Sequence, residues 1–349
     1  MEVYHSTFYA EHCHPERFTW FDSWKYPATV SHAISAILIP LNVYGGYCIL
    51  FKSPEKMRRV KWPMFNLHLW TSILDLLMSL LVTPFIFPPL LCGFSAGLLN
   101  FLPNIFLLFL LQCGLSFVNA SIVILFENRH SAVVTDRWKI NRKTTRLAVY
   151  ASNYIFGAFA TFPIYFRVPD QESAKLKMLQ LIPCPAEEFF DPNNFVLLDM
   201  DDKELIQIIA STHLGFFSAQ ILFYFFRIVY FLTAPNPSLS ENTKRLQRKI
   251  FIGICIQIAI PLIVVVIPML YMGYTSILNY YNQALTNTLT ILLSSHGITS
   301  TVAILLIYEP YRTFSKLLIY QCFGWKKTVT KVKETQKPKQ SVISVGIIE

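Results

Sequence analysis

Four polar residues stand inside long apolar stretches of this sequence, where their hydrogen bonds have to be made without water. Counted at 1.5 Å per helical residue from the basic ends of their stretches, Asp75 and His296 lie about 16 and 18 Å deep. Asn42 and Ser116 lie about 14 and 15 Å deep, so all four fall near the middle of a hydrocarbon layer about 30 Å thick. We therefore predict one buried polar layer of Asn42, Asp75, Ser116 and His296.

Two interpretations of this layer remain open. An ionisable residue within a membrane is functional by default, which favours a switch whose packing changes on activation, with a cation or a water between Asp75 and His296. The same residues would also make a static hydrogen-bonded cluster that fixes the register of the helices.

Catalytic chemistry is not expected from these residues. Inside the apolar stretches only Asp75 and Arg227 carry a full charge, so no pair of intramembrane carboxylates is present, and the sequence has no HExxH motif. We predict no catalytic residue, no metal ligand and no cofactor, and we do not expect an enzyme.

Seven apolar stretches supply the elements that position the polar residues. Each has the roughly 20 residues that a helix needs to cross a membrane. They are residues 29–51, 64–91, 102–126, 147–166, 205–232, 250–274 and 284–308. Only 15% of the chain is charged, against about 25% in soluble domains. We predict an all-α membrane protein, a bundle of seven transmembrane helices.

The distribution of lysine and arginine sets the expected orientation. These residues are concentrated in the loops after the first, third and fifth helices and in the C-terminal tail. The positive-inside rule therefore places the N-terminus outside and the C-terminus in the cytosol. Because the net charge of +9 belongs to the cytosolic face, anionic lipids of the inner leaflet are expected partners and nucleic acid is not.

The chain divides into four predicted parts. An extracellular segment 1–28 precedes the transmembrane domain 29–308. An interfacial amphipathic segment 309–325 follows, because Phe314, Leu317 and Leu318 have helical spacing. A basic cytosolic tail 326–349 lacks an apolar core and is expected to be disordered.

The cysteines allow one disulfide on the outer side. Cys184, set between two prolines in the long loop 167–204, is its first candidate, with either Cys13 or Cys92 as the partner. The loop itself either caps the outer mouth of the bundle or is a solvated loop without a ligand role. Cys322 is placed for palmitoylation beside the membrane, although a plain buried thiol is the commoner case.

Several short sequence motifs occur in order along the predicted helices. They include Tyr47-Cys48-Ile49-Leu50-Phe51-Lys52-Ser53-Pro54, Asn66-Leu67-His68-Leu69-Trp70, Leu74-Asp75-Leu76, Phe126-Glu127-Asn128-Arg129, His296-Gly297 and Pro310-Tyr311-Arg312. In this order and at these helix positions the chain resembles the nematode serpentine chemoreceptors of class H, over about residues 26–325. The resemblance implies a seven-helix G-protein-coupled receptor of a chemosensory neuron. It does not identify the odorant.

The end of the third helix also resembles the acid-arginine motif of rhodopsin-like receptors, whose arginine can leave its acid to meet the G protein. Here Asn128 separates Glu127 from Arg129, and residues two apart on a helix do not face each other, which puts the same ionic lock in doubt. The resemblance implies a G-protein-coupling surface made of Glu127, Asn128, Arg129, Arg245 and Arg248. The other interpretation is that Arg129 is one more anchor on the inner face.

A ligand pocket in the outer half of the bundle is also implied by the resemblance. Its candidate walls are mostly aromatic and methionine side chains with a few polar groups, which suits a small, mostly apolar ligand. They are Gln112, His213, Phe216, Phe217, Met269, Tyr271, Met272 and Asn287. Ordinary helix packing explains such residues as well.

The leading hypothesis is a chemosensory, olfactory receptor in the plasma membrane of a sensory neuron, in its sensory cilium. It would bind a small-molecule odorant or other chemical cue and signal to a heterotrimeric G protein. The alternative is a ligand-gated channel or a membrane transport protein. The sequence has no internal repeat, which disfavours a transporter. Insect-type receptor channels place the N-terminus in the cytosol, the reverse of the charge bias here.

Overall fold

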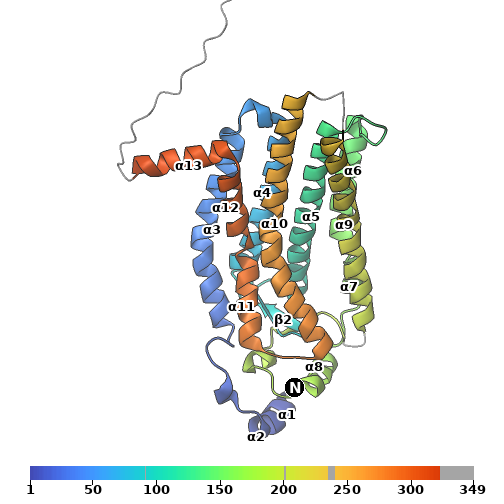
Figure 1. Ribbon diagram of the computed structural model, residues 1–349. Helices are drawn as coiled ribbons and strands as arrows, with labels where there is room; N and C mark the ends of the chain where they lie inside the picture. Colours follow the sequence, from blue (N-terminus) through green and yellow to red (C-terminus); the bar gives the residue numbers. More distant parts are fainter. Residues whose placement is uncertain (91, 200–201, 235–239, 323–349) are drawn as a thin grey trace, which may run out of the picture.

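The computed structural model describes residues 1–90, 92–199, 202–234 and 240–322. In this part of the chain seven helical segments are long and apolar enough to cross a membrane. They are α3 (Lys25–Phe51), α4 with the π-helical turn η4 (Arg58–Leu76 and Leu77–Leu81), α5 (Asn104–Val133), α6 with α7 (Lys143–Phe159 and Phe162–Tyr165), α9 (Lys203–Thr233), α10 (Glu241–Leu278), and α11 with α12 (Gln283–Ser294 and His296–Ile307). Figure 1 shows them side by side in one bundle, so the predicted seven-helix fold is confirmed.

The second helix is shorter than predicted, because it ends at Leu81 and not at residue 91. Hydropathy stays high beyond Leu81, but Pro84, Pro88 and Pro89 lack the backbone N–H that a helix requires. The chain forms strands there instead. The other spans mostly begin earlier or end later than predicted, since polar first and last turns escape a hydropathy window. The sixth, for example, begins at Glu241, where the Ser240 side chain accepts from the Thr243 N–H at 3.3 Å.

The seventh span is broken, although one continuous helix was predicted over residues 284–308. Helix α11 ends at Ser294 and α12 begins at His296. The side chains of Ser294, Ser295 and His296 bond to the backbone carbonyls of residues 291, 292 and 293, at 2.8, 2.7 and 2.8 Å. Such local bonds compete with the helical ladder and bend the backbone. The break thus follows from three consecutive polar residues.

One end of the bundle is covered by a small folded layer. Its sheet has the antiparallel order β1 (Pro84–Ile86), β2 (Cys92–Ser95), β3 (Phe195–Val196), with Phe85 opposite Phe94 and Gly93 opposite Phe195. Around it lie α1 (Glu2–Tyr4), η1 (His5–Tyr9), α2 (Ala10–His12), η2 (Pro15–Arg17), α8 (Gln171–Leu181) and η5 (Glu187–Phe190). We call residues 1–24, the sheet and residues 167–199 the cap, and this end the capped end (Figure 1).

The cap has its own apolar core, built from Phe85, Phe87, Met178 and Phe189 and other buried side chains. The long loop is therefore a folded part of the cap, which covers one end of the bundle. A disulfide joins Cys13 to Cys184, with Cα atoms 5.4 Å apart, and beside it the Tyr9 hydroxyl donates to the Pro185 carbonyl at 3.0 Å. Cys92, the other candidate partner, is a buried free thiol.

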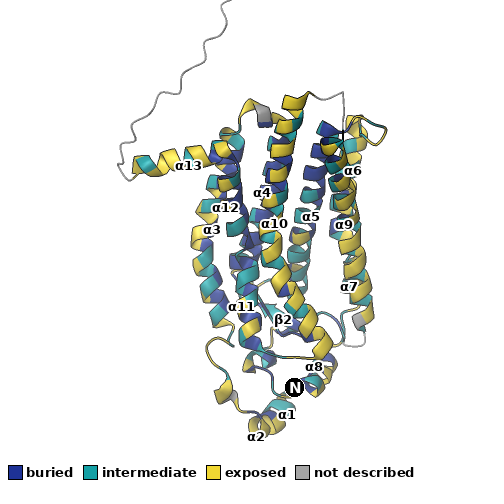
Figure 2. Ribbon diagram, viewed as in Figure 1, coloured by how far each residue is buried: buried dark blue, intermediate teal, exposed yellow. Residues whose placement is uncertain are grey.

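The opposite end carries the basic loops, and we call it the basic end. There the turn η3 (Glu55–Met57) joins α3 to α4, and α13 (Glu309–Cys322) leaves the end of α12 at a steep angle to the bundle helices and extends outward from them (Figure 1). Tyr311 of α13 is fully buried and its hydroxyl lies 2.6 Å from that of Ser53. Figure 2 shows exposed residues along the outward faces of the helices and buried ones toward the bundle centre. The predicted tail 326–349 lies outside the described residues.

Candidate functional site

A cluster of five buried polar side chains occupies the middle of the bundle, and we call it the polar core: Asn42, His68, Asp75, His296 and Thr301. Asp75 Oδ1 lies 3.2 Å from His296 Nδ1, and Asn42 Nδ2 donates to Asp75 Oδ2 at 3.2 Å. Thr301 Oγ1 donates to Asn42 Oδ1 at 2.6 Å, and His68 Nε2 lies 2.8 Å from the Asn42 carbonyl oxygen. Helices α3, α4 and α12 thus meet around one carboxylate that is 0% exposed.

Gly297 forms one wall of this site. A Cβ at that position would lie 1.5 Å from Asp75 Oδ2, so the backbone of α12 packs directly on the carboxylate. The break at Ser295 sets this approach, because it lies just before Gly297 in the chain. Among the described residues Asp75 Oδ1 accepts no aligned hydrogen bond. The nearest nitrogen, His296 Nδ1, lies closer to the Leu293 carbonyl, at 2.8 Å, than to Asp75 Oδ1. The carboxylate is therefore held on one side more firmly than on the other.

The predicted polar layer was partly wrong, because Ser116 does not belong to it. Ser116 Oγ lies 2.9 Å from His213 Nε2 and donates to the Gln112 carbonyl at 2.8 Å. Its side of α5 faces α6, where a Cβ at Gly157 would come within 2.9 Å of Ser116 Cβ. The count of residues placed Ser116 at the level of the other three, but a count does not say which way a helix face points.

His68 and Thr301 are members of the polar core that sequence reasoning missed. His68 precedes Asp75 by two helical turns and so lies on the same face of α4, a signal that was available. Gly45 leaves space for both, because a Cβ there would meet Thr301 Cγ2 at 2.7 Å and His68 Cε1 at 3.0 Å.

At the basic end, Glu127 and Arg129 have different partners. Glu127 is fully buried, accepts from Arg146 Nε at 2.8 Å and from the Tyr150 hydroxyl, and so joins α5 to α6. Arg129 is 3% exposed and donates to Asn128 Oδ1 at 2.6 Å and to Gln247 Oε1 at 3.5 Å. The doubt about an acid-arginine lock was justified, because the two residues do not pair.

Arg245 and Arg248 do not take part in the contact between Arg129 and α10. Both are exposed on α10, whereas the α10 side chain that meets Arg129 is Gln247. The predicted coupling residues therefore lie at the same end of the bundle, with one arginine buried and two facing out.

The structure does not gather the predicted ligand walls into one pocket. Gln112, His213, Phe216 and Phe217 form an aromatic-lined cluster with Ser116 between α5, α6 and α9. The remaining four lie elsewhere. Met269 is 49% exposed on the outside of α10, and the Tyr271 hydroxyl donates to the Asn282 carbonyl. The Asn287 side-chain amide donates to the backbone carbonyls of residues 21–23, and Met272 faces a cavity. Hydropathy and residue type did not reveal which helix faces meet.

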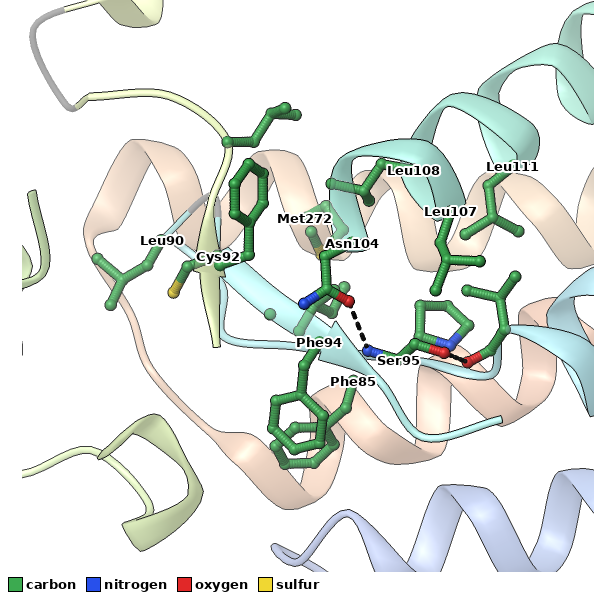
Figure 3. A pocket seen from close by; sticks show the side chains of 16 residues that line it. Phe85, Leu90, Cys92, Phe94, Ser95, Asn104, Leu107, Leu108, Leu111 and Met272 are labelled. Carbon is green, nitrogen blue, oxygen red and sulfur yellow. Dashed lines mark hydrogen bonds between the residues drawn. The ribbon is translucent and has the colours of Figure 1, made fainter. Parts of the chain in front are cut away.

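That cavity, which we call the hairpin cavity, lies between the β1–β2 hairpin and the first turns of α5, with a volume of about 140 Å³. Figure 3 shows Leu107, Leu108 and Leu111 of α5 on one side and Phe85 and Phe94 of the hairpin on another. Cys92 lines it too, and burial raises the pKa of the Cys92 thiol to about 12, so the thiol is neutral at physiological pH.

Residues 93–97 read Gly-Phe-Ser-Ala-Gly, which matches the GxSxG pattern of serine hydrolases. In those enzymes the serine sits on a strand-to-helix turn, whereas Ser95 ends β2 and its hydroxyl donates to the Val82 carbonyl at 2.7 Å. Close packing against backbone explains why both positions are glycine. A Cβ at Gly93 would lie 2.2 Å from the Phe85 carbonyl oxygen, and a Cβ at Gly97 would lie 2.4 Å from the Leu81 carbonyl oxygen. The match therefore reflects tight backbone packing.

Cys322 is exposed at the end of α13, where its thiol is accessible, and its palmitoylation stays a prediction. Among the described residues no group of three or more histidine, cysteine or acidic side chains is arranged to hold a metal ion.

Comparison with known proteins gives two matches that span this fold. A family model described as serpentine type 7TM GPCR chemoreceptor Srh matches residues 22–321. The chain is also 32% identical over 321 residues to serpentine receptor class H-72 of Caenorhabditis elegans, an alignment that covers 90% of this chain and 92% of that relative.

Proposed function

Because the chain belongs to the Srh family of serpentine seven-transmembrane chemoreceptors, we propose that it is a G-protein-coupled receptor that binds a small external chemical cue. The ligand would bind in the half of the bundle near the capped end, and a heterotrimeric G protein would bind at the basic end. Receptors of this kind are not an enzyme class, and no catalytic activity is proposed.

The orientation we propose has the cap outside and the basic end in the cytosol. The disulfide between Cys13 and Cys184 supports it, since disulfides persist in oxidising compartments. The basic loops at the other end support it independently through the positive-inside rule. The plasma membrane of a chemosensory neuron, in its cilium, is the proposed location.

The buried guanidinium of Arg129 is the observation that carries the coupling role. It lies where α5 meets α10, its two bonds go to neutral amide oxygens, and its Nε has no hydrogen-bond partner among the described residues. A buried charge without a full set of acceptors is costly. A partner that supplies carbonyl or carboxylate oxygens when α10 moves away would complete the set. The prolines at 261 and 268 within α10 favour such a movement, because each removes a bond of the helical ladder.

Signalling by an Arg129→Ala variant tests the proposal. Cells that express the receptor, a heterotrimeric G protein and a second-messenger reporter are screened with a panel of volatile and water-soluble cues. We expect Arg129→Ala to lose at least about 90% of the response with normal surface expression, because truncating the guanidinium removes a charge-assisted hydrogen-bond donor. The matched control is Arg137→Ala, an exposed arginine at the same end, which should respond like the parent.

Two results would contradict the proposal. A full response from normally expressed Arg129→Ala would exclude the coupling role. Antibody access to a C-terminal epitope tag on intact cells would reverse the proposed orientation and favour a channel or transport protein.

A further inference from the structure

We propose that the hairpin cavity is a binding site for a small, neutral, mostly apolar molecule of about the size of a monosubstituted benzene. The signalling consequence of binding rests on the proposed receptor function, whereas binding itself does not.

The lining excludes a charged ligand. Among the residues that the structure describes, no lysine, arginine, aspartate or glutamate lines the cavity, and its walls are mainly leucine, phenylalanine and other carbon-rich side chains. Most of the polar donors at its edge are already used: one Asn104 Nδ2–H donates to the Asn193 carbonyl at 2.7 Å, and Ser95 Oγ donates to the Val82 carbonyl at 2.7 Å. Figure 3 shows the third bond there, from the Ser95 N–H to Asn104 Oδ1 at 3.3 Å. A ligand would therefore meet mainly apolar surface, with a few acceptor oxygens and one Asn104 N–H at the edge, which suits a neutral molecule with few polar groups.

The size limits the ligand to few atoms. The cavity volume of about 140 Å³ is close to that of an apolar protein cavity of about 150 Å³ that stays dry and binds benzene. Molecules of roughly six to nine non-hydrogen atoms are expected to fit, by the same comparison. Volatile aromatic and short-chain neutral compounds have this size and polarity.

The walls connect the cavity to the rest of the receptor. Leu108 and Leu111 belong to α5, whose other end carries Arg129, and Met272 belongs to α10, which carries the Gln247 partner of Arg129. The hairpin pairs through β2 with β3 of the disulfide-linked long loop. A ligand in the cavity thus touches both helices that meet at the basic end. Its contacts change whenever the spacing of α5 and α10 changes, which is the condition for a ligand to shift a conformational equilibrium.

Binding is tested with the purified full-length protein in lipid nanodiscs and with benzene, ethylbenzene and butylbenzene as probes. The measurement is the rise in thermal unfolding temperature with probe concentration. Leu108→Trp fills the cavity, and Leu115→Trp is the matched control, because Leu115 lies two turns further along α5, is 45% exposed and does not line the cavity. The control experiences the same bilayer, so it removes the effect of probe that dissolves in lipid.

The parent and Leu115→Trp should be stabilised by benzene and ethylbenzene more than by butylbenzene, and Leu108→Trp should lose the shift. Leu111→Ala, which enlarges the cavity, should move the preference toward butylbenzene. The proposal is overturned if Leu108→Trp responds like the parent, if no probe shifts the parent, or if Leu111→Ala keeps the parent's order of preference.

Signalling in the reporter cells separates this proposal from the receptor function. A cue that activates the parent and Leu115→Trp but not Leu108→Trp supports both. A cue that activates all three equally overturns the cavity as the signalling site while the receptor function stands. Probe binding as expected, with no reporter response to any cue in the panel, supports the cavity and counts against the receptor function.

Discussion

Replacing Gly297 by alanine tests the packing of the polar core directly. The added Cβ would lie 1.5 Å from Asp75 Oδ2 and 2.1 Å from Asp75 Cγ, well inside any allowed contact. Asp75 is 0% exposed and cannot turn toward solvent. Either the carboxylate must rotate away from Asn42 or α12 must move away from α4.

The expected cost combines two effects. Overpacking a buried site costs about 1 to 3 kcal/mol, and losing a hydrogen bond to a charged group costs about 1.5 to 3 kcal/mol. Alanine is favoured over glycine within a helix by about 1 kcal/mol, which offsets part of this. The variant should therefore be destabilised by about 2 to 5 kcal/mol.

Thermal unfolding of the full-length protein in detergent, followed with a thiol-reactive dye, provides the measurement, because Cys48 and Cys92 are buried free thiols that unfolding exposes. Gly273→Ala and Gly215→Ala are the controls, since a Cβ at either helical position meets nothing within 4 Å. They should unfold at or slightly above the parent temperature, while Gly297→Ala should unfold several degrees lower.

A double mutant tests whether the clash with the Asp75 carboxylate causes the destabilisation by Gly297→Ala. In an Asp75→Ala background the carboxylate is gone, so adding Gly297→Ala should cost much less than it does in the parent. The reasoning would be refuted if Gly297→Ala were as harmless as the two controls. It would also be refuted if its cost were the same with and without the Asp75 carboxylate.

Two further predictions concern opposite ends of the molecule. Arg146→Gln should destabilise the protein by about 3 kcal/mol or more in the same unfolding assay, because it removes the cationic partner of the buried Glu127 carboxylate. Arg142 is exposed, so Arg142→Gln should stay within about 0.5 kcal/mol of the parent, and equal effects of the two substitutions would contradict the ion pair. Cys92, whose pKa burial raises to about 12, should resist alkylation at pH 8 until the protein unfolds, whereas exposed Cys322 should react at once; equal rates by peptide mass spectrometry would contradict a closed cap.

The sequence by itself determined the presence of seven spans and the common level of three polar residues that meet in the structure. Hydropathy and length are properties of each segment alone, and the rise per helical residue is constant, so Asp75, His296 and Asn42 were placed at one level by counting. The family resemblance also rested on short local sequence motifs, and it was confirmed over residues 22–321.

Local polar residues caused the failures in the helix boundaries. The prolines after Leu81 ended the second helix early, and Ser294, Ser295 and His296 broke the seventh, although the surrounding residues remained apolar. A hydropathy average is insensitive to a missing N–H or to a side chain that bonds to its own backbone.

Only the tertiary structure decided which faces meet. Ser116 has the right depth for the polar core, yet it faces His213, because the rotation of a helix about its axis is set by packing against its neighbours. The choice of Cys13 over Cys92 for Cys184, and the hairpin cavity, likewise depend on how distant segments fold into the cap. Depth along a helix is a matter of counting residues, but partners across helices depend on contacts between segments far apart in the chain.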